Sequence, residues 1–152
     1  MSDMMKDPMV LRQIIIDHYQ YPRNHQLTKA EGYVEKHMAS DSCIDDIYVQ
    51  GKVEDGVVQD IRFDGEACTI STASTSIMSE LVKGKRVEEA RKIMDNYFAM
   101  VDQKEYDEDL LEEAVAFANV GRQANRINCA TIGWRALREI LDESEGNSDE
   151  QK

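Results

Sequence analysis

One stretch decides the fold of this chain: residues 57–82 read VVQDIRFDGEACTISTASTSIMSELV and change from the period of a strand to the period of a helix. In the first part, Ile61 and Phe63 alternate with charged residues, which predicts a half-buried strand. Small capping residues follow Cys68 and predict a helix start, and an apolar stripe from Ile77 continues that helix. We therefore expect Cys68 to lie between a strand and a helix.

The residues before this stretch predict one helix and the rest of a sheet. Asp7-Pro8 places a capping acid before a proline at the first helical position, and Pro22 ends the helix. Strand-forming residues then occur around Val34 and Ile47. Asp55-Gly56 predicts a hairpin turn before the next strand. The expected sheet is therefore small and antiparallel.

The residues after this stretch predict helices. Apolar stripes occupy 87–97 and 110–117, and a last helix is expected around Trp134. The acidic segment from Gln103 to Glu113 predicts a solvated face or loop. Strands followed by helices are typical of an α+β domain. We expect helices packed on one side of the small antiparallel sheet.

Length and charge predict a single domain over residues 1–141, followed by an acidic, disordered tail at 142–152. The net charge of −12 makes nucleic acid and anionic membranes poor partners. No apolar run approaches the ~20 residues that span a bilayer, and the N-terminus lacks the apolar core of a secretion signal. We expect a cytoplasmic protein that binds neither nucleic acid nor membrane.

The candidate site residues are the three cysteines, Cys43, Cys68 and Cys129, and the nearby acid Asp45. Three thiols and one carboxylate make a complete tetrahedral ligand set for zinc or iron. An odd number of cysteines argues against a closed disulfide framework, and reduced thiols fit the cytoplasm. The sequence therefore indicates metal or thiol chemistry at one shared site.

Each cysteine could instead be a small buried hydrophobe, because the cysteine spacings match no local metal motif. Location favours a site: Cys68 and Cys129 are both expected at helix starts, where backbone N–H groups favour a thiolate, and Cys43 lies in a polar loop. No histidine neighbours a cysteine, so we leave histidine out of the ligand set. Arg126 is either an ordinary surface charge or a hydrogen-bond donor to Asp45 or a thiolate.

From about Val10 to Leu141 the chain resembles the IscU/NifU N-terminal family of iron–sulfur cluster assembly proteins. The resemblance is carried by an opening motif and by the surroundings of the second and third cysteines. These motifs are Ile15-Ile16-Asp17-His18-Tyr19 with Pro22-Arg23-Asn24, then Gly65-Glu66-Ala67-Cys68-Thr69-Ile70-Ser71-Thr72-Ala73-Ser74, then Arg126-Ile127-Asn128-Cys129-Ala130 with Trp134 beyond.

Two features resemble the SufU branch of that family. Asn128 stands where the scaffold branch has a histidine, and the acidic segment from Gln103 to Glu113 fits the extra residues of the SufU branch. The first-cysteine motif departs from the usual NPxCGD and reads SDSCID over residues 40–45. Asp41 and Ile44 therefore stand in place of the usual proline and glycine.

The resemblance implies zinc bound by Cys43, Asp45, Cys68 and Cys129, and sulfur accepted from a PLP-dependent, SufS-type cysteine desulfurase. It implies that Cys43 leaves the zinc to become the persulfide acceptor, while a histidine of the desulfurase displaces Asp45. Such a protein works with the desulfurase and with other Suf assembly proteins, and is sulfurtransferase-like rather than an independent enzyme. Two alternatives stay open: a scaffold on which the same ligands hold a transient [2Fe–2S] cluster, and an interaction domain with a purely structural zinc.

Overall fold

The structure is a computed structural model that describes residues 7–39 and 44–150, with side chains described as far as Ser144. Its elements follow in chain order. They are α1 (Pro8–Gln20), β1 (Tyr33–Ala39), β2 (Asp46–Glu54), β3 (Val57–Glu66), α2 (Thr69–Val82), α3 (Val87–Val101), α4 (Glu108–Leu111), the 3-10 helices η2 (Glu112–Phe117) and η3 (Val120–Arg122), and α5 (Ala124–Glu150).

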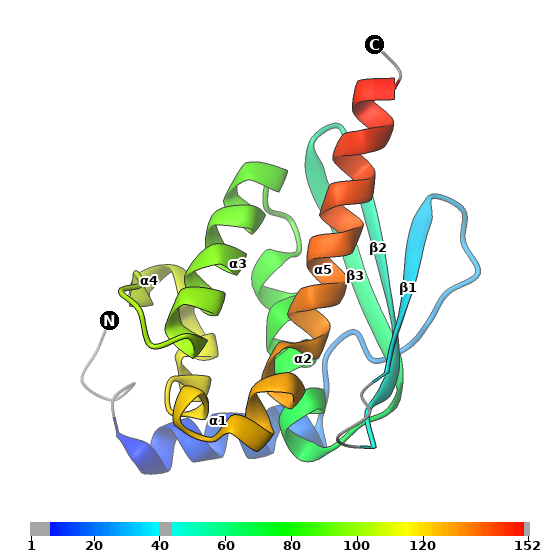
Figure 1. Cartoon of the computed structure of the whole chain (residues 1–152). Helices are drawn as coiled ribbons and strands as arrows, with labels where there is room; N and C mark the ends of the chain where they lie inside the picture. Colours follow the sequence, from blue (N-terminus) through cyan, green and yellow to red (C-terminus); the bar gives the residue numbers. More distant parts are fainter. Residues whose placement is uncertain (1–6, 40–43, 151–152) are drawn as a thin grey trace.

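The three strands form one antiparallel sheet in the order β1-β2-β3, and α2, α3 and α5 lie on one side of it (Figure 1). This arrangement confirms the predicted α+β class. The hairpin between β2 and β3 turns at Asp55 and Gly56, whose φ angles of 54° and 73° are both positive. Aspartate followed by glycine is favoured at such a turn, as the sequence predicted.

The N-terminal helix also begins and ends as predicted. The Asp7 carboxylate accepts a hydrogen bond from the Met9 N–H at 2.9 Å, with Pro8 in the first helical position. The backbone N–H of Tyr21 closes the last turn on the Asp17 carbonyl, and Pro22 follows. Local capping chemistry is therefore enough to define α1.

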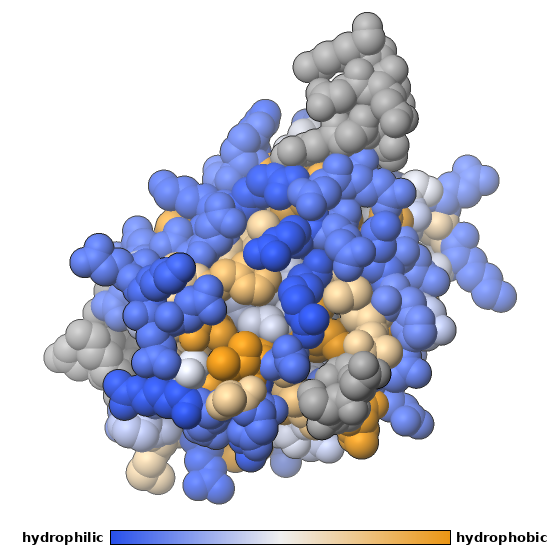
Figure 2. Space-filling view, in the orientation of Figure 1, coloured by the Kyte–Doolittle hydropathy of each residue, from blue (hydrophilic) through white to orange (hydrophobic). Residues whose placement is uncertain are grey.

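The core lies between the helical side of the sheet and the helices α2, α3 and α5. Its largest fully buried side chains come from these layers and from the 3-10 segment: Trp134, Tyr97, Phe63, Phe117, Ile47 and Ile61. Figure 2 shows hydrophilic residues over most of one face, with apolar side chains reaching the surface in its lower half. Within the described part of the chain, no helix has the length and apolar character needed to cross a membrane.

The last helix differs from expectation at its C-terminal end. The predicted acidic tail begins at residue 142, but α5 continues to Glu150 and projects past the other elements at the top of Figure 1. Extending an existing helix costs far less than starting one, and no proline interrupts these residues. Packing of Ile140 and Leu141 in the core supplies the start from which the helix extends.

The helix predicted over 110–117, at the end of the acidic segment, also differs in detail. Most residues of the acidic segment, which was predicted as a solvated face or loop, are exposed, and Asp107 caps the short helix α4 within it. The helix predicted over 110–117 is instead the end of α4 followed by the 3-10 helix η2. The reason lies at Glu112, whose φ of 46° interrupts α-helical geometry between the two.

Candidate metal site

Asp45 reaches the site because of the register between β2 and β3. Ile47 pairs with Gly65, so the residue just before β2 lies beside the chain that leaves β3 toward Cys68. Gly65 has φ +131°, and a Cβ there would lie 2.3 Å from the Asp46 carbonyl oxygen. Only glycine allows this close approach, and the approach brings Asp45 next to Cys68.

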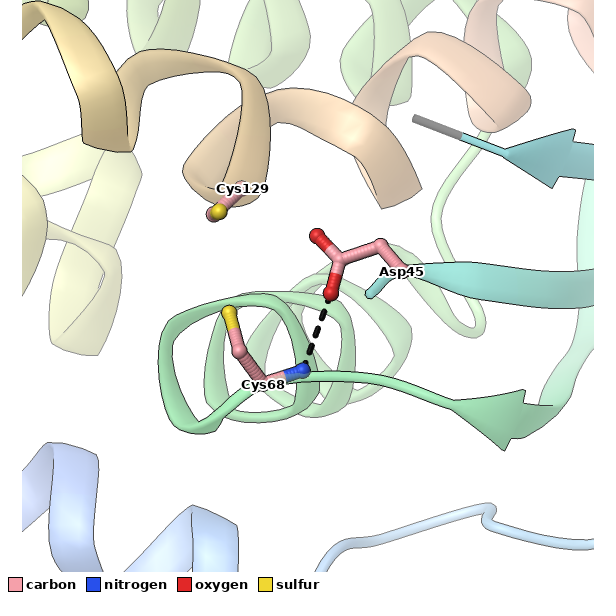
Figure 3. A group of neighbouring side chains, drawn as sticks. All are labelled: Asp45, Cys68 and Cys129. Atoms are coloured by element: carbon pink, nitrogen blue, oxygen red, sulfur yellow. Dashed lines mark hydrogen bonds between the residues drawn. The ribbon is translucent and has the colours of Figure 1, made fainter. Parts of the chain in front are cut away.

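Cys68 is the N-cap of α2, which confirms the predicted junction between strand and helix. Its φ and ψ of −71° and 173° are extended, and its sulfur accepts a hydrogen bond from the Ser71 N–H at 3.5 Å. The thiol thereby replaces the oxygen that serine or aspartate supplies at most helix starts. The sulfur is held at the positive end of α2, pointing toward Cys129 (Figure 3).

Cys129 does not lie at a helix start, so that prediction was wrong. Helix α5 begins at Ala124, which places Cys129 more than one turn inside it, beyond the first four backbone N–H groups. Burial and helix packing position this cysteine instead: it is 6% exposed, and Gly133, one turn later on the same face, lies against Thr75 of α2. Close contact between the two helices therefore brings Cys129 to the site.

The structure brings three of the four predicted ligands together. One possible ligand atom from each of Asp45, Cys68 and Cys129 lies within 4.8 Å of the other two (Figure 3). Zinc bonds of 2.0–2.3 Å place tetrahedral ligand atoms roughly 3.3–3.8 Å apart, so these three atoms are at most about 1.5 Å further apart than bound ligands would be. Two sulfur donors and one carboxylate are a donor set that suits zinc or iron.

The fourth predicted ligand, Cys43, lies outside the described residues. Ile44, the described residue next to it, is 67% exposed, whereas Asp45 is 2% exposed. The chain therefore passes from solvent into the site over these two residues. Arg126 lies exposed in the first turn of α5, and both of its interpretations, an ordinary surface charge and a donor to Asp45 or a thiolate, stay open.

The sequence analysis missed Ser71, which lies fully buried between two of the ligands. Its hydroxyl donates to Oδ2 of Asp45 and lies 3.3 Å from Sγ of Cys68. The other carboxylate oxygen, Oδ1, accepts the Cys68 backbone N–H at 2.9 Å. The signal was present in the motif around Cys68, but its serines were interpreted only as capping residues.

A buried polar network behind Cys129 was missed as well. The Ala130 carbonyl accepts hydrogen bonds from the Ser74 and Tyr97 hydroxyls, both at 2.6 Å, and the Trp134 Nε1–H donates to Ser74 Oγ at 3.2 Å. The rings of Tyr97 and Trp134 stack with centroids 4.1 Å apart. Burial raises the pKa of Tyr97, which keeps its phenol protonated as a donor. The network fixes the turn of α5 that carries Cys129.

The histidines take no part in the group of possible metal ligands within the described ranges. His18 is buried and contacts Ser76 Oγ at 2.8 Å and Glu113 Oε2 at 3.0 Å, which is a structural role. His37 lies in β1 and pairs with Asp46.

Comparisons with known proteins agree with this architecture. Residues 11–146 match the NifU-like N-terminal domain family. The chain is 36% identical to the zinc-dependent sulfurtransferase SufU of Bacillus subtilis, over 90% of this chain and 92% of that protein. It is 35% identical to the iron–sulfur cluster assembly scaffold protein IscU of Streptococcus pyogenes, over 86% of this chain and 82% of that protein.

A solved structure of similar fold points to the same family. The fold matches that of a candidate iron–sulfur cluster assembly scaffold protein for the SUF system from Fervidobacterium islandicum, with a TM-score of 0.77 and 29% identity. The match covers 85% of this chain and 94% of that one. The extent of both the sequence and the structural match leaves no ambiguity about kinship, and the chain belongs to the family of NifU-like N-terminal domains.

Proposed function

We propose that this protein is a zinc-bound sulfur acceptor that takes persulfide sulfur from a SufS-type cysteine desulfurase during iron–sulfur cluster assembly. The observation that carries the proposal is the convergence of Asp45, Cys68 and Cys129 at the start of α2. The similarity to a relative named as a zinc-dependent sulfurtransferase supports zinc as the metal. Cys43 completes the proposed ligand set, and the reducing cytoplasm is the proposed compartment because ligand thiols must stay reduced.

Cys43 is the proposed acceptor of the sulfur. Its thiolate attacks the outer sulfur of the desulfurase persulfide, so one S–S bond forms on Cys43 while the S–S bond of the donor breaks. The bonding electrons leave with the desulfurase cysteine as a thiolate, and no external oxidant or reductant is needed. The exposed Ile44 beside it supports this assignment, since an acceptor must be accessible to another protein.

Asp45 is the proposed ligand that yields. A carboxylate is a harder ligand than a thiolate and is displaced more easily by a softer donor. Its two oxygens already have protein donors in the Cys68 N–H and the Ser71 hydroxyl, so the displaced carboxylate is not left unpaired. Cys68 and Cys129 are anchored on helices and suit permanent ligation.

A scaffold that assembles a [2Fe–2S] cluster is the second candidate function. Several relatives are named as iron–sulfur cluster assembly scaffold proteins, and three thiolates with one weaker acid make a cluster site that is easily given up. Asn128 in place of histidine favours the acceptor over the scaffold. The partners proposed for either function are the desulfurase and other Suf assembly proteins.

The test is to map the persulfide. The protein is mixed with a SufS-type desulfurase and cysteine, trapped with an alkylating agent and digested for mass spectrometry. We expect the extra sulfur on Cys43, and we expect Cys43→Ser to abolish stimulation of the desulfurase while the circular dichroism spectrum stays unchanged. Extra sulfur mainly on Cys68 or Cys129, with Cys43 unmodified, would overturn the assignment.

A further inference from the structure

Ser71 places a single hydroxyl between two of the proposed ligands. Its Oγ donates to Oδ2 of Asp45 and lies 3.3 Å from Sγ of Cys68, and its backbone N–H donates to the same sulfur. The side chain is fully buried, so water does not compete for these contacts. A serine hydroxyl carries one proton, which can be donated to the carboxylate or to the sulfur but not to both.

The two acceptors need that proton at different moments. If a metal bound Asp45 through Oδ2, this oxygen would no longer need the Ser71 hydroxyl, which would then be free to turn toward Sγ of Cys68, 3.3 Å away. Once the carboxylate leaves the metal, Oδ2 becomes a buried charged oxygen, and leaving such an atom without a donor is costly. The neighbouring Thr72 cannot replace the serine, because its hydroxyl faces the Ala67 carbonyl at 3.5 Å.

We propose that Ser71 is a positioning residue that receives Asp45 when this carboxylate leaves the metal. Oδ1 keeps the Cys68 N–H throughout, so the exchange changes the partner of one oxygen and needs no movement of Asp45 into solvent. Ser71 thereby sets how easily an incoming ligand displaces Asp45. The inference rests on the proposed function, in which Asp45 is the ligand that yields.

The test uses Co²⁺ in place of zinc, because the visible spectrum of cobalt reports its ligands, and imidazole as the incoming ligand. We expect the imidazole concentration at half-displacement to rise about ten-fold in Ser71→Ala, because the released carboxylate loses a charge-assisted hydrogen bond. Thr72→Ala is the matched control, since it removes a hydroxyl from the same helical turn without touching Asp45, and its midpoint should stay within about two-fold of wild type.

Two further variants keep the result decisive. Ser71→Thr retains a hydroxyl and should keep the wild-type imidazole midpoint. A midpoint raised about ten-fold in folded Ser71→Thr would overturn the inference, even if Ser71→Ala does not fold. An unchanged or lowered midpoint in folded Ser71→Ala would overturn it directly. Asp45→Ala tests the underlying ligand assignment: if its cobalt spectrum and imidazole response equal those of wild type, the proposed function fails rather than the role of Ser71.

A metal-free measurement separates positioning from ordinary packing. After chelation, Ser71→Ala should lower the melting temperature in the wild-type chain but not in the Asp45→Ala background, where the carboxylate is already absent. A packing role predicts the same loss in both backgrounds. If Ser71→Ala lowered the melting temperature equally in both backgrounds and left the imidazole midpoint unchanged, Ser71 would be an ordinary core residue.

Discussion

Gly133 of α5 lies against Thr75 of α2 so closely that a Cβ on the glycine would be 2.4 Å from the threonine Oγ1. Gly133 lies one turn after Cys129, and Thr75 lies two turns after Cys68, each on the same face as its cysteine. The contact therefore fixes the distance between the two helices that carry the thiols. A glycine that cannot itself bind a metal is thus part of the construction of the site.

We expect Gly133→Ala to destabilise the protein by about 1–3 kcal/mol, because overpacking a full core forces the helices apart. The metal should also bind more weakly, since Cys129 moves with α5. Urea unfolding followed by the fluorescence of Trp134, the only tryptophan, measures the stability.

The double variant Gly133→Ala, Thr75→Ala is the control for this prediction. It removes the two closest threonine atoms and should recover part of the stability and of the metal affinity. If Gly133→Ala alone were as stable as wild type and bound metal equally well, the close approach would not hold the site together.

Tyr97→Phe should destabilise the protein by roughly 1–2 kcal/mol, because a buried hydrogen bond is lost while the ring remains. The hydroxyl donates to the Ala130 carbonyl at 2.6 Å, and this carbonyl keeps the Ser74 donor. Urea unfolding measures the change, with Tyr19→Phe at an exposed tyrosine as the control. An equal loss of unfolding free energy in Tyr97→Phe and Tyr19→Phe would contradict a role for the buried network.

Asp60 should make the stability depend on pH in acid. Burial raises its pKa, but hydrogen bonds from Tyr33 and Arg62 and the charge of Lys83 outweigh this and hold the pKa below the ordinary value of 3.8. Because the pKa of Asp60 is lower in the folded than in the unfolded state, the ionised carboxylate stabilises the fold above about pH 4. This stability is lost as the pH falls through the pKa of the folded state.

Asp60→Asn should therefore lower the free energy of unfolding by roughly 1–2 kcal/mol at pH 7, and the difference from wild type should shrink below about pH 4. Unfolding in urea between pH 2.5 and 7 measures it. Asp95→Asn changes an exposed carboxylate on α3 and serves as the control. A difference that stays constant over this range would show that the ionised carboxylate is not what stabilises the fold.

Local chemistry made part of this structure predictable. The helix cap at Asp7-Pro8 and the turn at Asp55-Gly56 depend only on neighbouring residues. The start of α1 and the hairpin turn could therefore be predicted from the sequence alone. The three cysteines and Asp45 could be nominated because their side chains are typical metal ligands.

Other features depend on contacts between distant segments, and the sequence did not predict them. The position of Cys129 inside α5 follows from a helix that begins at Ala124 without a strong capping signal. The role of Ser71 appears only once β2 places Asp45 beside α2, and that of Gly133 only once α5 meets Thr75. Tertiary packing decided each of these.

Removal of the metal should lower the melting temperature by several degrees or more. The proposed ligands come from the chain before β2, the start of α2 and the body of α5, so a bound metal joins segments that are far apart in sequence. Metal bound only to the native state adds its binding free energy to the stability. Calorimetry before and after chelation, with metal content verified, measures the shift; superimposable melting curves would contradict it.

Asp45→Ala should distinguish the sulfur acceptor from the cluster scaffold. In an acceptor we expect colourless protein with weakened zinc binding, because a ligand is lost and the Cys68 N–H and Ser71 hydroxyl lose their acceptor. In a scaffold the same change should lengthen the lifetime of a bound cluster and deepen its colour. Asp46→Ala is the matched control: its carboxylate is the next along the chain but is exposed and pairs with His37, away from the thiols. Metal analysis and visible spectra of both variants, purified anaerobically without added iron, give the answer, and a brown Asp45→Ala protein beside a colourless Asp46→Ala protein would favour the scaffold.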